Sequence, residues 1–186
     1  MKGPYFTDYV QEFIASGVVA FDAAALIRHG DGEAELPRTF VTAMGQEPNR
    51  PSIAQKAAEH GRMGRPSLAS LARDQELGAV FRIAKRPGNA FDHISVGRAA
   101  NVDVVLPLLR ISKFHAYFNC DASGQYTLSD AGSTNGTWIG AQLLPARTPE
   151  ALDDGARIRL GPYYFTFATA SGFERMVRNR ALDRGR

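Results

Sequence analysis

Cysteine is nearly absent from the sequence, and this absence removes several kinds of protein from consideration. Cys120 is the single cysteine among 186 residues, so an internal disulfide and a zinc site built from several cysteines are both excluded. We expect this cysteine to pack in a core. The 4 histidines also lack the spacing of metal ligands. We therefore expect no metal ion and no cofactor.

The sequence has no large excess of charge and no long apolar run. Lys and Arg number 22 against 19 Asp and Glu, a formal net charge of +3, which favours an acidic or phosphorylated partner but is too small to indicate nucleic-acid binding. No apolar run approaches the about 18 residues of a membrane helix. The first residues also lack an apolar secretory segment. We therefore expect a cytoplasmic protein that binds neither nucleic acid nor membranes.

The residues that are present are typical of a soluble globular protein, with 44% hydrophobic and 22% charged. In the segment 1–76, apolar residues recur at helical spacing over 9–14, and a short helix is expected over 23–29. Ser52 and Ser67 have the features of helix N-caps. We predict that residues 1–76 form a helical N-terminal extension or a small subdomain.

The segment 77–170 changes to a spacing of two, with frequent turn residues and many β-branched and aromatic side chains. The alternating apolar positions include Phe81/Ile83, Ile94/Val96, Ala116/Phe118, Ile158/Leu160 and Phe165/Phe167. Short strands without helices between them predict a mainly β protein built as an antiparallel β-sandwich. The last segment, 171–186, is rich in arginine, and we expect a short basic C-terminal helix or tail with Phe173, Met176 and Val177 on one side.

Three short motifs follow one another in the β-rich segment. Gly97-Arg98 ends one strand-like run, Ser112-Lys113-Phe114-His115 opens another, and Gly132-Ser133-Thr134-Asn135-Gly136 is a polar loop flanked by glycines. The two glycines permit sharp turns, so the short polar side chains between them are held on a rigid backbone. In this order, the motifs resemble those of the forkhead-associated (FHA) domain family over 77–170. The resemblance implies an FHA-like β-sandwich with its ligand loops at one end.

The chemistry of a phosphothreonine suits these residues. The group carries nearly two negative charges and three acceptor oxygens at neutral pH. The guanidinium of Arg98 is a permanent cation that can donate two parallel hydrogen bonds, and Ser112 and Lys113 add hydroxyl, N–H and ammonium donors. The resemblance implies further that Thr134 lines the phosphate pocket and that Asn135 holds the backbone of the bound peptide.

The resemblance also implies structural roles for several neighbours. Gly97, Gly132 and Gly136 are expected to shape the backbone of the site, and His115 is expected to brace the segment that carries the serine. Phe114 stands where the family often has a polar or basic residue. The peptide preference beyond the phosphate is therefore not carried over from the family.

A catalytic interpretation finds little support in the motifs. Ser112, His115 and Asp130 are the residue types of a hydrolytic triad, but on a strand Ser112 and His115 would point to opposite faces. No Gly-x-Ser-x-Gly sequence surrounds the serine, and the polar loop lacks the Lys-Ser/Thr that completes a nucleotide-binding loop. We therefore expect a phosphothreonine-binding signalling adaptor and not an enzyme. Its partner would be a threonine-phosphorylated protein or peptide, such as a Ser/Thr kinase or its substrate.

Two further interpretations stay open. In the first, an FHA-fold scaffold assembles a protein complex through apolar surfaces, independently of phosphate, and Leu108 and Leu109 would contribute to such a surface. In the second, a phosphorylated threonine of the N-terminal extension, such as Thr39 or Thr42, docks on Arg98 within the same chain and blocks other partners.

Overall fold

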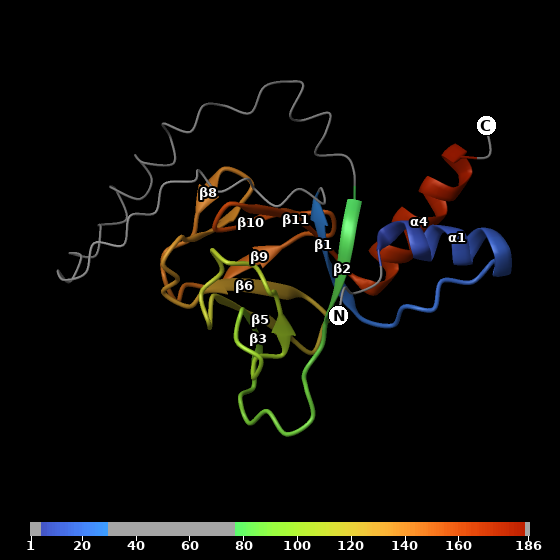
Figure 1. Ribbon diagram of the computed structural model, residues 1–186. Coiled ribbons are helices and arrows are strands. Elements are labelled where there is room, and N and C mark those ends of the chain that lie inside the picture. Colours follow the sequence, from blue (N-terminus) through green and yellow to red (C-terminus); the bar gives the residue numbers. More distant parts are fainter. Residues whose placement is uncertain (1–4, 30–76, 185–186) are drawn as a thin grey trace.

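Two β-sheets packed face to face, with a pair of helices at one end, form the part of the chain that the computed structural model describes, residues 5–29 and 77–184 (Figure 1). The six-stranded sheet has the order β2-β1-β11-β10-β7-β8, and the five-stranded sheet has the order β4-β3-β5-β6-β9. Paired strands are antiparallel except for β3 and β4, which are parallel. The predicted β-sandwich is confirmed.

The elements have the following bounds: α1 (Phe6–Ser16), β1 (Ala24–His29), β2 (Leu77–Ile83), β3 (Ile94–Gly97), β4 (Val104–Val105), β5 (Ala116–Cys120), β6 (Tyr126–Asp130), β7 (Thr137–Ile139), β8 (Gln142–Leu143), β9 (Glu150–Leu152), β10 (Arg157–Leu160), β11 (Tyr163–Ala168) and α4 (Ala170–Arg184).

The main core lies between the two sheets and is built from the inward side chains of alternating positions. Leu26 pairs with Phe167 across β1 and β11, and Phe118 pairs with Leu128 across β5 and β6. All four side chains are fully buried in this core. Because side chains alternate between the two faces of a strand, the spacing of two seen in the sequence places one apolar set inward on each sheet. The loops that join the strands are thereby held on a rigid double layer.

The helices α1 and α4 pack together beside β1 and β11 and make a second core (Figure 1). Their apolar sides cover Ala25 and Ile27, the residues of β1 that point away from the main core. In α4, Phe173 and Val177 are fully buried and Met176 is partly buried. The predicted C-terminal helix and its apolar side are confirmed.

The helix predicted over 23–29 is wrong, because Ala24–His29 form strand β1 between β2 and β11. The strand is buried on both faces: Leu26 points into the main core, whereas Ala25 and Ile27 point under the helices. A short run that is apolar on both faces shows no alternation, so its sequence alone does not separate a central strand from a buried helix. The sandwich therefore takes one strand from the segment 1–76.

Several other expectations have different outcomes. The remaining division into 1–76, 77–170 and 171–186 stays a prediction, and the helix starts predicted at Ser52 and Ser67 lie outside the described residues. Cys120 is exposed instead of packed in a core, because burial along β5 ends before its last two residues. Within 5–29 and 77–184, no helix is long and apolar enough to span a membrane.

Candidate functional site

Gly97, the last residue of β3, lets two segments of the chain approach closely. A Cβ atom at this position would lie 2.2 Å from the carbonyl oxygen of Lys113, well inside contact distance. Without it, the N–H of Arg98 donates to the carbonyl oxygen of Ser112 at 2.9 Å, and the N–H of Ala99 donates to that of Lys113 at 3.1 Å. The Gly-Arg and Ser-x-x-His motifs therefore lie side by side.

The side chain of Arg98 extends from this junction into solvent. Its Nε donates to the carbonyl oxygen of Ile111 at 3.3 Å, which fixes the direction of the guanidinium. Among the residues of the structure that are described, no carboxylate lies within ion-pair distance of Arg98. Its positive charge is therefore available to an anionic ligand.

Ser112 and Thr134, which are 22 positions apart in the sequence, meet at the same junction. The backbone N–H of Thr134 donates to Oγ of Ser112 at 3.1 Å, and the two hydroxyl oxygens lie 3.5 Å apart. Thr134 is exposed and Ser112 is partly exposed. Since each hydroxyl can rotate to donate to a new acceptor, the pair can serve an anion that lies beside the arginine.

Asp130, at the end of β6, folds the polar loop that follows it. Its Oδ2 accepts from the N–H groups of Gly132 at 2.8 Å and Ser133 at 3.0 Å. Its Oδ1 accepts from the hydroxyls of Ser133 at 2.6 Å and Thr137 at 2.8 Å. Sequence reasoning missed this role. The available signal was the spacing Asp-x-Gly-Ser, because an aspartate often accepts hydrogen bonds from backbone N–H groups two or three residues onward in a turn.

The glycines of the polar loop adopt a conformation that other residues disfavour. Gly132 and Gly136 have φ angles of 82° and 80°, in the left-handed region where a side chain is strained. At Gly136 a Cβ atom would also lie 2.7 Å from the ring of Trp138. The N–H of Gly136 donates to Oγ of Ser133 at 2.8 Å. Both glycines therefore shape the turn that presents the threonine.

His115 is fully buried and connects the two motif segments. Its Nδ1 accepts from the N–H of Ser112 at 3.1 Å, and its Nε2 lies 3.0 Å from the carbonyl oxygen of Gly136. Because Nδ1 is an acceptor, the proton resides on Nε2 and is donated to that carbonyl oxygen. The expectation that Ser112 and His115 point to opposite faces of a strand is wrong, since β5 begins only at Ala116.

Asn135 is anchored to the segment that precedes the serine. Its Nδ2 donates to the carbonyl oxygen of Arg110 at 2.8 Å, and an added Cβ atom at Gly161 would lie 3.3 Å from the Cβ atom of Asn135. The asparagine thus holds the polar loop against two other connections of the sandwich. This anchoring contact did not form part of the sequence prediction.

The structure brings the predicted phosphate-binding residues together from three connections of the sandwich. Arg98 lies directly after β3, Ser112 and Lys113 lie before β5, and Thr134 lies between β6 and β7. Lys113 is exposed beside the serine. We call this junction of Arg98, Ser112, Lys113 and Thr134 the phosphate-site junction. The part that each side chain takes in ligand binding stays a prediction.

Residues 94–161 match the family model of the FHA domain. This part of the chain is an FHA domain. The match begins at β3 and extends past β10, so it contains all three motifs and the whole phosphate-site junction.

Two curated relatives share this FHA region. The chain is 36% identical over 73 residues to the E3 ubiquitin-protein ligase rnf8 of Danio rerio, which covers 37% of this chain and 15% of the relative. It is 34% identical over 93 residues to an FHA domain-containing protein of Arabidopsis thaliana, which covers 47% of this chain and 24% of the relative. The chain thus spans about a quarter or less of the length of these relatives.

Solved structures also resemble the FHA domain of this chain. The N-terminal FHA domain of Rad53p from S. cerevisiae, in complex with a phosphothreonine peptide, has a TM-score of 0.42 and 20% identity, covering 52% of this chain and 89% of that chain. EmbR of Mycobacterium tuberculosis, in complex with a low-affinity phosphopeptide, has a TM-score of 0.38 and 29% identity, covering 42% of this chain and 20% of that chain.

Proposed function

We propose that this FHA domain binds a threonine-phosphorylated protein or peptide and acts as a non-catalytic signalling adaptor. The observation that carries the proposal is the meeting of Arg98, Ser112 and Thr134 at one exposed junction. Arg98 carries a permanent cation and is bonded through its backbone to Ser112, whose hydroxyl contacts Thr134, and buried hydrogen bonds hold these loops in place. Such a preorganised set of donors fits a doubly charged anion with several acceptor oxygens.

Each residue of the junction has a definite task in this proposal. Arg98 donates from its terminal N–H groups to two phosphate oxygens, while Ser112 and Thr134 donate their hydroxyls to the remaining oxygen atoms. Lys113 adds a second positive charge. Asn135 uses Nδ2 on the chain itself, which leaves Oδ1 to accept an N–H group from the peptide backbone. A threonine methyl group buried at the site would favour phosphothreonine over phosphoserine by about 0.8 kcal/mol.

The proposal assigns no catalysis to the junction. A hydrolytic serine needs a histidine that accepts the proton of its hydroxyl. In His115, Nδ1 instead accepts from the backbone N–H of Ser112, and Nε2 is directed at the carbonyl oxygen of Gly136. The ring is therefore occupied as a structural brace. Incubation with a phosphothreonine peptide should release no inorganic phosphate.

Titration of labelled peptides tests the proposal. We expect a degenerate phosphothreonine peptide library to bind with a Kd of roughly micromolar order, or about −8 kcal/mol, and the same library without phosphate to bind far more weakly. Arg98→Ala removes charged hydrogen bonds of about 1.5–3 kcal/mol, so the Kd should rise about tenfold to a hundredfold. Arg180→Ala, at an exposed arginine of α4, is the matched control and should leave the Kd unchanged.

The same titration separates the proposal from phosphate-independent assembly. Leu109 is 72% exposed on the segment before the serine, so an apolar contact there is the specific alternative. If phosphorylated and unmodified peptides bind equally and Arg98→Ala has no effect, the phosphate proposal is wrong. If Leu109→Ala then abolishes binding of a partner while Arg98→Ala does not, the scaffold interpretation holds instead.

Docking of the N-terminal extension on Arg98 is a regulatory form of the same proposal. Deleting residues 1–76 would remove the central strand β1, so a truncation does not test it. The phosphorylated full chain should instead be compared with a phosphorylated Thr39→Ala, Thr42→Ala double variant. Tighter binding of an added phosphothreonine peptide by the double variant supports internal docking, and equal binding excludes it for these threonines.

A further inference from the structure

A cavity of about 350 Å³ opens beside the phosphate-site junction. Aromatic and small apolar side chains provide much of its lining, which includes Phe91, His93, Ala99, Val102, Lys113 and Phe114. We call it the aromatic cavity. Its volume lies at the lower end of the range of sites that hold small molecules or single side chains.

The aromatic rings of the cavity are layered and exposed. Phe91 and His93 stack with ring centroids 5.2 Å apart and an interplanar angle of 18°, and His93 and Phe114 stack at 5.9 Å and 17°. Phe91 is 63% exposed and Phe114 is 42% exposed. In the described part of the chain they are the two exposed phenylalanines, and both line this one cavity. Such a concentration of exposed apolar surface is typical of a binding site.

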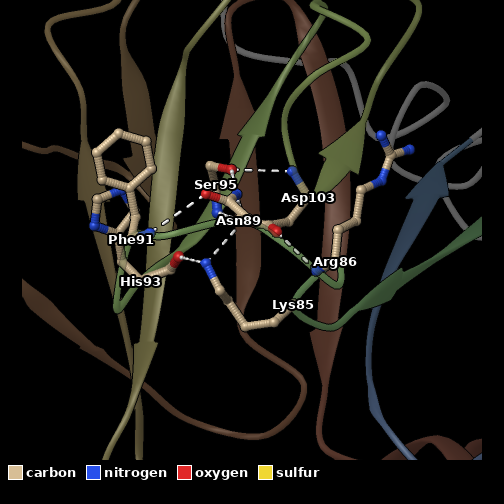
Figure 2. A network of polar contacts seen from close by, with 7 residues as sticks. All are labelled: Lys85, Arg86, Asn89, Phe91, His93, Ser95 and Asp103. Atoms are coloured by element: carbon tan, nitrogen blue, oxygen red, sulfur yellow. Dashed lines mark hydrogen bonds and ion pairs between the residues drawn. The ribbon is translucent and has the colours of Figure 1, made fainter.

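A buried carboxylate, Asp103, lies at the centre of a network of polar contacts that includes Asn89 and Ser95 of the cavity lining, and Figure 2 shows this network. The carboxylate of Asp103 accepts from the N–H of Arg86 at 2.8 Å, from Nδ2 of Asn89 at 2.8 Å, and from the N–H and hydroxyl of Ser95 at 2.7 and 2.6 Å. Nζ of Lys85 lies 3.6 Å from the same carboxylate. These bonds tie the β2–β3 connection to β3 and to the segment after Arg98.

The aromatic cavity and the phosphate-site junction share one piece of backbone. Ala99, in the lining of the cavity, follows Arg98 directly and donates its N–H to the carbonyl oxygen of Lys113. Lys113 belongs to both the cavity and the junction, and Phe114 comes next in the chain. Asn135, in contrast, contacts the segment at Arg110, before the serine. The cavity therefore adjoins the residues that follow Ser112, whereas Asn135 contacts a residue that precedes it.

We propose that the aromatic cavity binds an aromatic or large aliphatic side chain next to the phosphothreonine of the same peptide. This inference rests on the proposed function, because the phosphate sets the position of the peptide. An extended peptide advances about 3.3 Å per residue, so a residue close in sequence to the phosphothreonine reaches an adjoining cavity. Arg98 and Lys113 hold the charged part of the ligand, and Phe91 and Phe114 hold the apolar part.

Other occupants suit the cavity less well. The lining contains Lys113 and adjoins Arg98, so a ligand with a negative charge next to an apolar group fits it best. A phosphopeptide with an apolar residue near the phosphothreonine has both features. Because Phe114 lies within the Ser-x-x-His motif, between Lys113 and His115, the aromatic lining and two of the phosphate donors belong to one short segment. Binding of the phosphate and of the apolar side chain should therefore support each other.

A scanned peptide set tests the inference. The probes are glycine-serine peptides with one central phosphothreonine, in which a single phenylalanine, leucine or alanine occupies each flanking position in turn. Fluorescence anisotropy gives the Kd of each peptide for the wild type and for Phe91→Ala, which changes an exposed side chain outside the phosphate-site junction. Leu182→Ala, at a leucine of α4 that is 70% exposed, is the matched control.

At one flanking position, we expect phenylalanine or leucine to lower the Kd of the wild type about five- to tenfold relative to alanine, in line with partial burial of a large apolar side chain. Phe91→Ala should lose most of this preference and keep the affinity for the alanine-flanked peptide, whereas Leu182→Ala should keep both. Arg98→Ala should weaken binding to every peptide in the set.

Three results would overturn the inference, and they are distinguishable. If the wild type binds phosphothreonine peptides with no preference at any flanking position, the cavity is not a peptide subsite although the proposed function stands. If no phosphothreonine peptide binds, the proposed function and this inference fail together. If Phe91→Ala leaves the preference intact but turns a dimer into a monomer in sedimentation, the cavity is a contact between two copies of the chain.

Discussion

Replacing Gly97 by alanine tests how closely the Gly-Arg and Ser-x-x-His motifs must approach. The added methyl group would lie 2.2 Å from the carbonyl oxygen of Lys113 and 3.0 Å from the Cα atom of Phe114. The carbonyl oxygen belongs to the backbone and cannot rotate away like the end of a side chain. The segment that carries Ser112 must therefore shift.

The magnitude follows from the contacts that such a shift disturbs. Two backbone hydrogen bonds join the segments, from Arg98 to Ser112 at 2.9 Å and from Ala99 to Lys113 at 3.1 Å, and each contributes about 1 kcal/mol. Overpacking adds about 1–3 kcal/mol. We expect Gly97→Ala to lower the free energy of unfolding by about 3 kcal/mol and, in the molecules that remain folded, to weaken phosphothreonine binding at least about tenfold.

Urea unfolding followed by circular dichroism measures the first quantity, and peptide titration below the unfolding transition measures the second. Gly155→Ala is the control, because Gly155 has a φ of 86° but an added Cβ atom there meets no other atom within 4 Å. That variant carries backbone strain without a clash, so it should lose stability but keep its affinity for the peptide. If Gly97→Ala unfolds at the wild-type urea concentration and binds the peptide with the wild-type Kd, the close approach of the two motifs does not shape the site.

Three further substitutions have defined outcomes. Burial alone would raise the pKa of Asp103, but hydrogen bonds from Arg86, Ser95 and Asn89 outweigh burial and hold that pKa far below its usual range. The ionised carboxylate therefore stabilises the fold fully above the unfolded-state pKa of about 3.9, and this stabilisation is lost as the pH falls further. In urea unfolding, the stability deficit of Asp103→Asn should shrink below that pH, and a deficit that is constant with pH would contradict this. Asp130→Ala leaves several buried donors without an acceptor at about 1–3 kcal/mol each, so both stability and phosphothreonine affinity should fall, and unchanged affinity in a folded variant would show that the polar loop does not depend on the carboxylate. Phe173→Ala empties a fully buried site between the helices and should lower the free energy of unfolding by about 3–5 kcal/mol without changing the Kd of the folded protein, since the ring lies in the helical core and not at the junction; a large change in Kd would instead couple the helices to the site.

The sequence was sufficient to predict the β-sandwich. It also singled out Arg98, Ser112, Lys113 and Thr134, which the structure places at one junction, while their part in ligand binding stays a prediction. Apolar residues alternate with other residues at Ile158/Leu160 and Phe165/Phe167 because one face of the sheet is buried in the main core, and this alternation is visible in the sequence. Arg98, Ser112 and Thr134 belong to three motifs that follow one another in a fixed order, and the resemblance to FHA domains predicts from the sequence that they share one site.

Other features depend on tertiary contacts that leave no local pattern. Strand β1 is covered by a sheet on one face and by helices on the other, so the period that identifies a strand is absent. Asp130 acts through the conformation of the loop that follows it. The aromatic cavity unites Phe91 with Phe114 through the β2–β3 connection, which Asp103 holds in place. These contacts join residues that are distant in the sequence or depend on the shape of a loop, so they become visible only in the folded structure.

Amide NMR of the labelled domain during titration with a phosphothreonine peptide tests the central claim most directly. Because the backbone N–H of Thr134 bonds to Oγ of Ser112 and Nε of Arg98 bonds to the carbonyl oxygen of Ile111, a phosphate at the junction must disturb both signals. We predict large shifts of the Thr134 amide and the Arg98 Nε–H signals with the phosphorylated peptide, and almost none with its unmodified form. If the phosphorylated peptide binds and shifts other signals but leaves those of the Thr134 amide and the Arg98 Nε–H unchanged, the account is contradicted.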